Sequence, residues 1–586
     1  ENVFMIGSSL SSTVADATYV NALITKPGIE GGMGDGSIDI TGNGRLNGAY
    51  LSCTASDSIY FWKSTASDVS KGFVFGSTTA CMAGDKTVIA NMIFKAHVGD
   101  WSSSAGSINR QAAAMRVYSA SAWSSDDVDD APSNMGFYLQ SQGGASTLDG
   151  LNEAKLWIQG VDGRVGIGTT DPSALLHVNG SFIAGGAGNA VSASLGATIV
   201  AGEDNDIYDS PYSVIGAGDD NELSGATNCA IVVGRANTIS GGLYTAIGGG
   251  EGNTAYASSH TNIVGGQLNK QESSEASFIG GGYTNHISGT PYAIIAGGYG
   301  NNIASPTTNV GTQFIGGGKN NKLLEASQHA FLGGGQDNSI CSSAWSYIGA
   351  GKNNSISGVG QYNSIGGGRN IQISGDATYN TIGGGNTIKI VGDAADQSIY
   401  TTVMGGSSIT VSATEYAFIG GGKDHTVTAS DKSVIVAGES NSLFGTERSL
   451  ILGGLSNSIV RDDTPDLSGE SPEYAVITNG NYNQIKGKVK WSAIHNGSVN
   501  TIQEQKSSTG IAAPGVVSNT ILNGSNHKIF NANHATILNG HYTNTISGYK
   551  AALCTNSLIG GGGYNFISST AYNNHASLVT SSYNTI

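Results

Sequence analysis

Acidic residues at regular intervals are the side chains of this sequence whose types and spacing come nearest to a catalytic arrangement. Glu203, Asp204, Asp219, Asp220 and Glu222 fall in corresponding parts of a sixteen-residue count. Two carboxylates held about 5 to 9.5 Å apart can hydrolyse a glycosidic bond. A soluble protein with so few charged residues also places them at exposed turns, and repeat units of sixteen residues are too small to form the sides of a substrate cleft. We therefore predict no catalytic residue, with polysaccharide hydrolysis as the less favoured alternative.

Metal and phosphate sites are also expected to be absent. The acidic runs at residues 126–130 and 462–466 lack the spacing of a calcium-binding loop, so we interpret them as solvated turns. Gly280-Gly281-Gly282 lacks the Gly-Lys-Ser/Thr ending of a phosphate loop. Five histidines stand at or beside corner positions without Cys or Glu at ligand spacing, and we expect them on the surface: His425, His495, His527, His534 and His541. The sequence thus predicts neither a metal site nor a cofactor.

The acidic residues at 203–222 and the glycines at 280–282 belong to a repeat of sixteen residues between Ser181 and Ile303. An Ile stands six residues before each of eight evenly spaced asparagines, and a Gly-rich step joins the two, as in Ile279 to Asn285. The asparagines are Asn189, Asn205, Asn221, Asn237, Asn253, Asn269, Asn285 and Asn301. A fixed period this short is the signature of a stacked repeat.

The repeat unit predicts an all-β fold. Sixteen residues are too few for a helical hairpin, and each interior Gly would weaken a helix by about 1 kcal/mol. We therefore predict a parallel β-solenoid in which each coil holds an Ile-bearing strand, a corner of Gly and Asn, a second short strand and a return of small residues. Gly and Asn suit corners because both tolerate a left-handed backbone. Stacked coils would align the Asn side chains in a ladder about 4.8 Å apart, so we expect these asparagines to build corners and bind no ligand.

Composition and charge narrow the classes of protein to which the chain can belong. Charged residues make up only 12% of 586 residues, and Gly occurs 88 times. Such a composition is compatible with disorder, but the strict apolar period favours order. The net charge of −16 disfavours nucleic acid as a partner. The sequence contains no apolar run of about 18 residues, so membrane insertion is not predicted. The five cysteines are scattered and indicate neither a disulfide framework nor a metal site.

The repeat does not extend over the whole chain. Residues 1–24 fit one terminal coil, residues 163–180 are expected to be a connector, and residues 181–586 are expected to be a solenoid shaft with inserted loops. Residues 25–162 hold four of the six tryptophans and strand-like runs between turn signals, which predicts a β-sandwich-like domain. Its expected strands lie at residues 37–40, 59–62, 72–75, 90–96, 114–118, 136–139 and 155–158.

After Ile303 the sixteen-residue count continues with slippage. The expected core positions are Ile315, Leu332, Ile348, Ile365, Ile382, Val403, Ile419, Ile435, Ile451, Ile477, Ile494, Leu522, Leu538, Ile559 and Leu578. Together with the earlier positions they predict 23 coils and a shaft of about 110 Å. Ile371, Ile388 and Ile409 replace the ladder Asn in three coils, where we expect an altered corner with an apolar side chain turned inward.

Longer steps in the count predict loops that project from a face of the solenoid. Smaller ones are expected near residues 305–311 and 391–400, and the largest at 460–474 and 501–517. Irregular loops on a rigid scaffold commonly carry recognition. The candidate contact residues in the two largest loops are Arg461, Asp462, Asp463, Asp466, Glu470, Gln503, Glu504 and Lys506.

Coils this thin would leave apolar flanks uncovered. Three chains packed side by side would bury those flanks, so we expect a homotrimer.

The join between the predicted domain and the repeats carries a resemblance to a known family. Val165-Gly166-Ile167-Gly168-Thr169-Thr170-Asp171-Pro172, followed by Leu176-His177-Val178-Asn179-Gly180, resembles the join found in many bacteriophage tail fibres. Residues 19–23 are similar to a segment that follows solenoid coils in those proteins. Such fibres often end in a self-cleaving chaperone of the endosialidase type, which we expect either to have been removed by autoproteolysis or to be absent from this kind of fibre. The repeats resemble, more loosely, the heads of trimeric autotransporter adhesins.

The resemblance implies a trimeric attachment fibre of a virion tail. Its implied partners are other copies of the chain, other tail proteins, and a host-surface glycan or outer-membrane protein. A bacterial adhesin or extracellular filament subunit is the alternative, located at the cell surface, and a polysaccharide-depolymerising tailspike is a third and less favoured one.

Overall fold

The computed structural model describes residues 4–6, 18–20, 88–98, 108–119, 133–139, 154–160, 162–305, 311–392, 395–461, 471–504, 516–548, 554–569, 576–578 and 585. Every secondary-structure element among them is a β-strand, so the all-β prediction is confirmed. The chain divides into two units, residues 1–76 and 77–586. In the first unit, β1 (Phe4–Ile6) pairs in parallel with β2 (Thr18–Val20).

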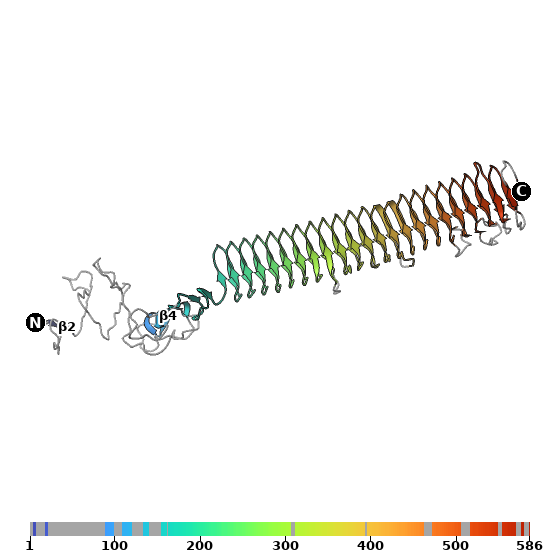
Figure 1. Cartoon of the computed structure of the whole chain (residues 1–586). Coiled ribbons are helices and arrows are strands. Elements are labelled where there is room, and N and C mark those ends of the chain that lie inside the picture. The colour runs from blue at the N-terminus through green and yellow to red at the C-terminus, as the bar shows by residue number, and fades with distance from the viewer. Residues whose placement is uncertain are drawn as a thin grey trace. The chain divides into compact units, whose positions relative to one another are not determined.

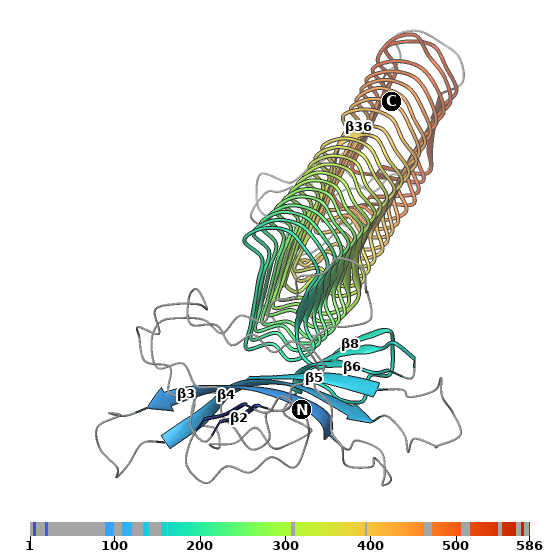
Figure 2. The ribbon, with the colours of Figure 1, turned by 90° about the vertical axis from the view of Figure 1, so that its left-hand side faces the viewer.

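The second unit contains a six-stranded sheet (blue to teal in Figure 2) and the repeats. The sheet consists of β3 (Val88–Val98), β4 (Ile108–Ser119), β5 (Ser133–Leu139), β6 (Ala154–Ile158), β7 (Val165–Ile167) and β8 (Leu176–Val178), in that order. Neighbouring strands are antiparallel except β7 and β8, which are parallel. Large buried side chains of Tyr118, Tyr138 and Trp157 pack on this sheet, and the two tyrosine hydroxyls lie 2.6 Å apart.

This sheet confirms the four predicted strands between residues 90 and 158. The three predicted strands at residues 37–40, 59–62 and 72–75 lie outside the described residues. The described part of the region forms one sheet, so the second layer of a sandwich is not among it. Strands β7 and β8 come from the predicted connector and extend the same sheet, because β7 pairs with β6 and β8 pairs with β7.

From residue 182 onward the chain winds into a parallel β-solenoid, the stack of coils coloured from teal to red in Figure 1. In a typical coil, β21 (Phe278–Ile279) leads through a Gly-rich corner to β22 (His286–Ser288), and a short return completes the turn. Each strand pairs with its equivalent in the next coil, so that Ile279 lies opposite Ile295 and Ile287 opposite Ile303. The predicted architecture is therefore confirmed, with about 21 coils, slightly fewer than the 23 expected.

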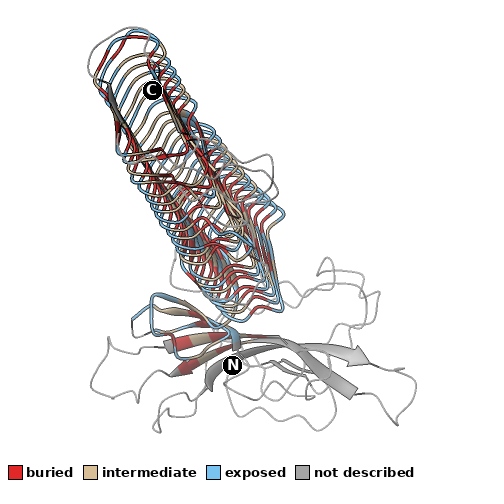
Figure 3. Cartoon of the chain, turned by 90° about the vertical axis from the view of Figure 1, so that its right-hand side faces the viewer, coloured by how far each residue is buried: buried red, intermediate tan, exposed pale blue. Residues whose placement is uncertain are grey.

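Two parallel sheets run along the solenoid. The short-strand sheet extends from β9 (Phe182–Ile183) to β57 (Ala576–Leu578), and most of its strands are two residues long. The long-strand sheet contains 22 strands, from β10 (Ala190–Ser192) to β56 (Phe566–Ser569). Alternation along each strand points every second side chain inward, and these inward residues are the buried ones that line the interior in Figure 3.

The prediction that Leu522 and Leu538 lie in the core is wrong. Leu522 and Leu538 are 40% and 37% exposed, whereas the preceding Ile521 and Ile537 are fully buried. Ile494 pairs with Ile521, and Ile521 pairs with Ile537, so these three side chains all point into the core. Successive residues of a strand face opposite sides, so Leu522 and Leu538 must face outward. The expected core residue Ile183 is 41% exposed, in the first strand of its sheet.

The three coils in which Ile replaces the ladder Asn behave as expected. Ile371, Ile388 and Ile409 are fully buried. The corner also changes, because β34 (Asn386–Val391) and β36 (Ser407–Ser412) run six residues through it instead of three. Ile388 pairs with Ile409 within this extended ladder. At this corner neighbouring coils are therefore joined by backbone pairing, whereas in other coils the Asn side chain forms the hydrogen bonds between them.

Candidate functional site

The eight ladder asparagines are structural, as predicted. Asn253 shows the pattern: it is fully buried, and its Nδ2 donates to Asn237 Oδ1 at 3.0 Å and to the carbonyls of Gly249 and Gly266 at 3.0 and 2.9 Å. Its Oδ1 accepts from the backbone N–H of Asn269 at 3.0 Å. The left-handed backbone lies one residue earlier, as at Asp220 (φ 56°) and Thr284 (φ 52°), so the Asn contributes hydrogen bonds and not the unusual φ that we had expected of it.

The acidic residues near the start of the solenoid meet at one corner. Carboxylate oxygens of Asp204, Asp219 and Asp220 lie within 4.8 Å of one another, and all three residues are exposed. Glu203 and Asp219 bridge neighbouring coils. The sequence therefore correctly indicated that stacking brings these carboxylates together. Exposed acidic groups at a turn are fully solvated, and this geometry alone assigns them no reaction.

Of the predicted contact residues, only Arg461, Gln503 and Glu504 belong to the described part of the chain. Arg461 lies with its guanidinium 5.9 Å from the ring centre of Phe444. Gln503 is partly buried, next to Glu504, which is only 3% exposed and whose carboxylate accepts a 2.9 Å hydrogen bond from the Lys488 backbone. Asp462, Asp463, Asp466, Glu470 and Lys506 lie outside the described residues. The structure therefore places Glu504 inside a corner, where its carboxylate does not face solvent.

Two of the five histidines are not on the surface, which corrects that prediction. His425 and His527 occupy ladder-Asn positions and are fully buried, and Nδ1 of each accepts the backbone N–H of the next ladder residue at 3.2 and 3.3 Å. Burial disfavours the imidazolium ion and lowers the pKa of both, that of His527 to about 4. The remaining three, His495, His534 and His541, are exposed as expected.

The described cysteines are free thiols inside the coils or beside them. Cys229 and Cys554 are buried and Cys341 is partly buried. Burial raises the pKa of all three thiols above the usual value. A protonated, buried thiol is a poor nucleophile, so these residues act as small packing side chains.

A column of exposed aromatic rings is the most prominent surface feature that sequence reasoning missed. It occupies the corner before the short-strand sheet in six consecutive coils and consists of His329, Trp345, Tyr362, Tyr379, Tyr400 and Tyr416, which we call the aromatic ridge. The three successive tyrosine pairs have ring centres 4.9, 5.0 and 4.9 Å apart and planes inclined by 2°, 9° and 14°. Trp345 and the four tyrosines are 44–51% exposed.

The backbone conformation at this corner does not favour aromatic residues. All six residues have a left-handed φ between 53° and 59°, which costs a bulky residue about 1–2 kcal/mol. At the other left-handed corner the same coils carry small polar residues that tolerate it, such as Asn353, Asn370 and Ser408. Parallel aromatic stacking returns about 0.5–1.5 kcal/mol per pair. Stacking therefore roughly offsets the strain, and stability alone gives little reason for aromatic residues here.

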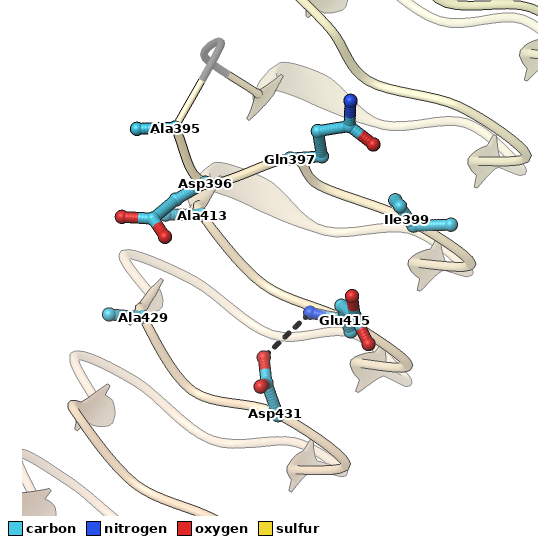
Figure 4. A pocket seen from close by; sticks show the side chains of 8 residues that line it. All are labelled: Ala395, Asp396, Gln397, Ile399, Ala413, Glu415, Ala429 and Asp431. Carbon is cyan, nitrogen blue, oxygen red and sulfur yellow. Dashed lines mark hydrogen bonds between the residues drawn. The ribbon is translucent and has the colours of Figure 1, made fainter.

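A groove of about 400 Å³ lies beside the ridge on the return segments of three coils. Its lining residues are Ala395, Asp396, Gln397, Ile399, Ala413, Glu415, Ala429 and Asp431, shown as sticks in Figure 4. Ile399 and Glu415 immediately precede the ridge residues Tyr400 and Tyr416 in the chain. The carboxylate of Asp431 turns toward the coil above and accepts a 2.9 Å hydrogen bond from the Glu415 backbone N–H (Figure 4). The groove thus combines carboxylate and amide side chains with small apolar ones.

The outward face of the short-strand sheet is apolar along most of its length. Phe314, Phe331 and Tyr347 stack on it with ring centres 5.0 and 5.3 Å apart. Other exposed apolar residues on this face are Val200, Val214, Val232, Val264, Phe278, Ile294, Met404, Phe418, Val436, Leu452, Leu522 and Leu538. The outward residues of the long-strand sheet are instead mostly Ser, Thr, Lys, Glu and Gln. The two faces of the solenoid therefore differ sharply in polarity.

No family model matches the chain, and a search of curated proteins finds no match. Among the residues that the structure describes, there is no helix long and apolar enough to cross a membrane. The site is therefore characterised by its geometry: a rigid solenoid with one apolar face, and an aromatic ridge with a polar groove at the border of that face.

Proposed function

We propose that the protein is a structural and receptor-binding fibre of a virion tail, which assembles as a homotrimer and attaches the particle to the host cell surface. The observation that carries the proposal is the combination of a long solenoid shaft with one apolar face. About 21 coils at the strand spacing of about 4.8 Å give a shaft of roughly 100 Å. A stack of this kind suits a spacer that holds a contact surface away from a particle.

The apolar face supports the trimer. Exposed apolar patches far larger than a few hundred Å² are rare on monomers and mark interfaces, and aromatic residues are enriched at such interfaces. The outward face of the short-strand sheet has this character over many coils, including the stacked Phe314, Phe331 and Tyr347. In the proposed trimer the three short-strand sheets face one another, and the polar long-strand sheets face solvent.

The receptor would be a glycan or an outer-membrane protein, bound without chemistry. Three symmetry-related copies of a weak site add through multivalency, because binding at one site raises the effective concentration at the next. The loops around residues 460–474 and 501–517 remain candidate contact surfaces.

Two measurements test this proposal. Light scattering under native conditions is expected to give three times the chain mass of 59.5 kDa, and a monomeric mass would refute the assembly. Phe418→Glu, on the apolar face, is expected to dissociate the trimer, whereas Thr426→Glu, on the outward face of the long-strand sheet in the same coil, is expected to leave it intact. Purified trimer is further expected to compete with virions for adsorption to host cells; adsorption unaffected by saturating trimer would contradict the attachment role.

A further inference from the structure

We infer that the aromatic ridge and the adjoining groove form a binding site for an extended, uncharged or amino-bearing glycan chain that lies along the solenoid. This inference rests on the proposed attachment function and deepens it by naming the ligand class and the place where it binds. The site lies on the side of the shaft, in the coils from residue 328 to residue 432, and not in the two large loops.

The first argument is the regular spacing of the ridge. Ring centres of Tyr362, Tyr379, Tyr400 and Tyr416 follow one another at 4.9 to 5.0 Å, a distance similar to the length of one sugar unit in an extended polysaccharide. Near-parallel rings at this distance are offset, so a strip of each ring remains uncovered. Sugar rings present C–H groups that pack against aromatic surfaces. A repeating chain can therefore make the same contact in each successive coil.

The second argument is the polar lining on one side of the ridge. Asp396, Gln397 and Glu415 line the groove (Figure 4) and provide carboxylate and amide groups for sugar hydroxyls. Hydrogen bonds to ionised groups are stronger than those between neutral groups. Aromatic contacts beside a few polar groups are the usual means of holding and orienting a small polar ligand.

The third argument concerns charge. Glu415, Asp431, Glu447 and Glu473 stand at equivalent positions in four successive coils beside the ridge column. Glu447 is paired with Arg448 at 2.7 Å, and Glu473 with Lys490 at 3.0 Å. At the groove itself the carboxylates of Asp396, Glu415 and Asp431 stand against the single exposed ammonium of Lys432, so the formal charge there is negative. An anionic polysaccharide would be repelled there, whereas hydroxyl or amino groups would not.

The same carboxylates argue against a second copy of the chain as the occupant. Packing another protein surface over the ridge would remove the carboxylates of Glu415 and Asp431 from water, and burial of a carboxylate without a counter-ion is strongly unfavourable. The ridge therefore suits the rim of the proposed trimer interface, where both water and a ligand have access, and the apolar sheet face suits its centre.

The test uses a variant with Tyr362→Asn, Tyr379→Asn and Tyr400→Asn together. Asn tolerates the left-handed backbone at these corners, so the coils are expected to fold. Tyr482→Asn is the matched control, because Tyr482 is 58% exposed and also left-handed (φ 57°) but lies at the other corner. The full chain is titrated with mannan as a neutral probe, chitosan oligosaccharide as an amino-bearing probe and hyaluronan as an anionic probe, and the native mass of each variant is measured.

The expected result is binding of mannan, chitosan oligosaccharide or both, weakened at least tenfold in the triple variant and unchanged in Tyr482→Asn. Any of four results would overturn the inference: no binding of either probe, binding of hyaluronan alone, equal binding by the triple variant, or dissociation of the trimer in the triple variant. Failure of the proposed function can be distinguished from failure of this inference, because it would appear in the unsubstituted chain as a monomeric mass or as a lack of competition with virions. If the triple variant still competes for adsorption as well as the unsubstituted chain, the fibre function stands and the ridge is not its receptor site.

Discussion

The Asn ladder permits a quantitative test of what holds neighbouring coils together. In Asn253→Ala, the backbone N–H of Asn269 loses its acceptor and the carbonyl of Gly249 loses the Nδ2 donor. The Gly266 carbonyl still accepts from the Glu251 backbone, and Asn237 Oδ1 still accepts from the backbone of residue 253. Two buried backbone groups are therefore left unsatisfied, at about 1–3 kcal/mol each. We expect a local destabilisation of about 2–6 kcal/mol.

The assay should report local stability, because a solenoid is stabilised mainly through nearest-neighbour contacts and need not unfold in one step. Hydrogen exchange followed by mass spectrometry is expected to show faster exchange in the coils that contain Asn237, Asn253 and Asn269, with distant coils unchanged. Lys270→Ala, at an exposed residue on the outward face of the long-strand sheet next to Asn269, is the control, and is expected to change stability by less than about 1 kcal/mol.

A second substitution separates hydrogen bonding from cavity formation. Asn253→Asp preserves the shape and the acceptor but replaces the donor with an oxygen and places a carboxylate at a fully buried position. It is expected to destabilise these coils at neutral pH and less so in acid, where the carboxyl is protonated. The reasoning would be refuted if Asn253→Ala exchanged like Lys270→Ala, or if Asn253→Asp were as stable as the unsubstituted chain at pH 7.

Two further predictions concern a buried histidine and a glycine at a corner. His527 has a pKa of about 4 in the folded chain against about 6.5 when unfolded, so the unfolded state binds more protons between these values and stability is expected to fall as the pH drops from about 6.5 to 4. Hydrogen exchange of its coil at pH 5 and 7.5 should show this loss, His527→Asn should abolish it, and the exposed His534→Asn should not. Gly282→Ala is expected to cost at least about 2 kcal/mol, because φ is 95° and a Cβ would lie 2.1 Å from the Gly298 carbonyl oxygen; Gly334→Ala, with nothing within 4 Å, should be tolerated, and equal melting of the two variants would contradict this.

Much of the fold was predictable because the period is a local property of the chain. An Ile and an Asn at fixed spacing in eight units are enough to define a coil, its inward side and its corner. Even the three Ile replacements of the ladder were correctly interpreted, since an apolar residue at an inward position can only be buried. Prediction failed where two apolar residues were adjacent, as at Ile521 and Leu522, because an insertion upstream removed the count that distinguishes inward from outward.

The candidate site depended on the tertiary structure. Trp345, Tyr362, Tyr379, Tyr400 and Tyr416 follow one another at unequal steps in the sequence, so no fixed period reveals them. Each of them stands three residues before a predicted core position (Ile348, Ile365, Ile382, Val403 and Ile419), so their place relative to the core was the signal that could have found them. The stacking of the rings and the groove beside them are visible only in the coordinates. Buried His425 and His527 were likewise assigned to the surface because polarity was considered without the ladder position that they occupy.

The sequence by itself therefore determined the solenoid, its Ile core and its Asn ladder, since these depend on residue type at a constant spacing. Only the tertiary structure decided which outward side chains become neighbours. Insertions are accommodated outside the paired strands, so the coils remain in register and bring residues at irregular sequence intervals into one column, about 4.8 Å apart.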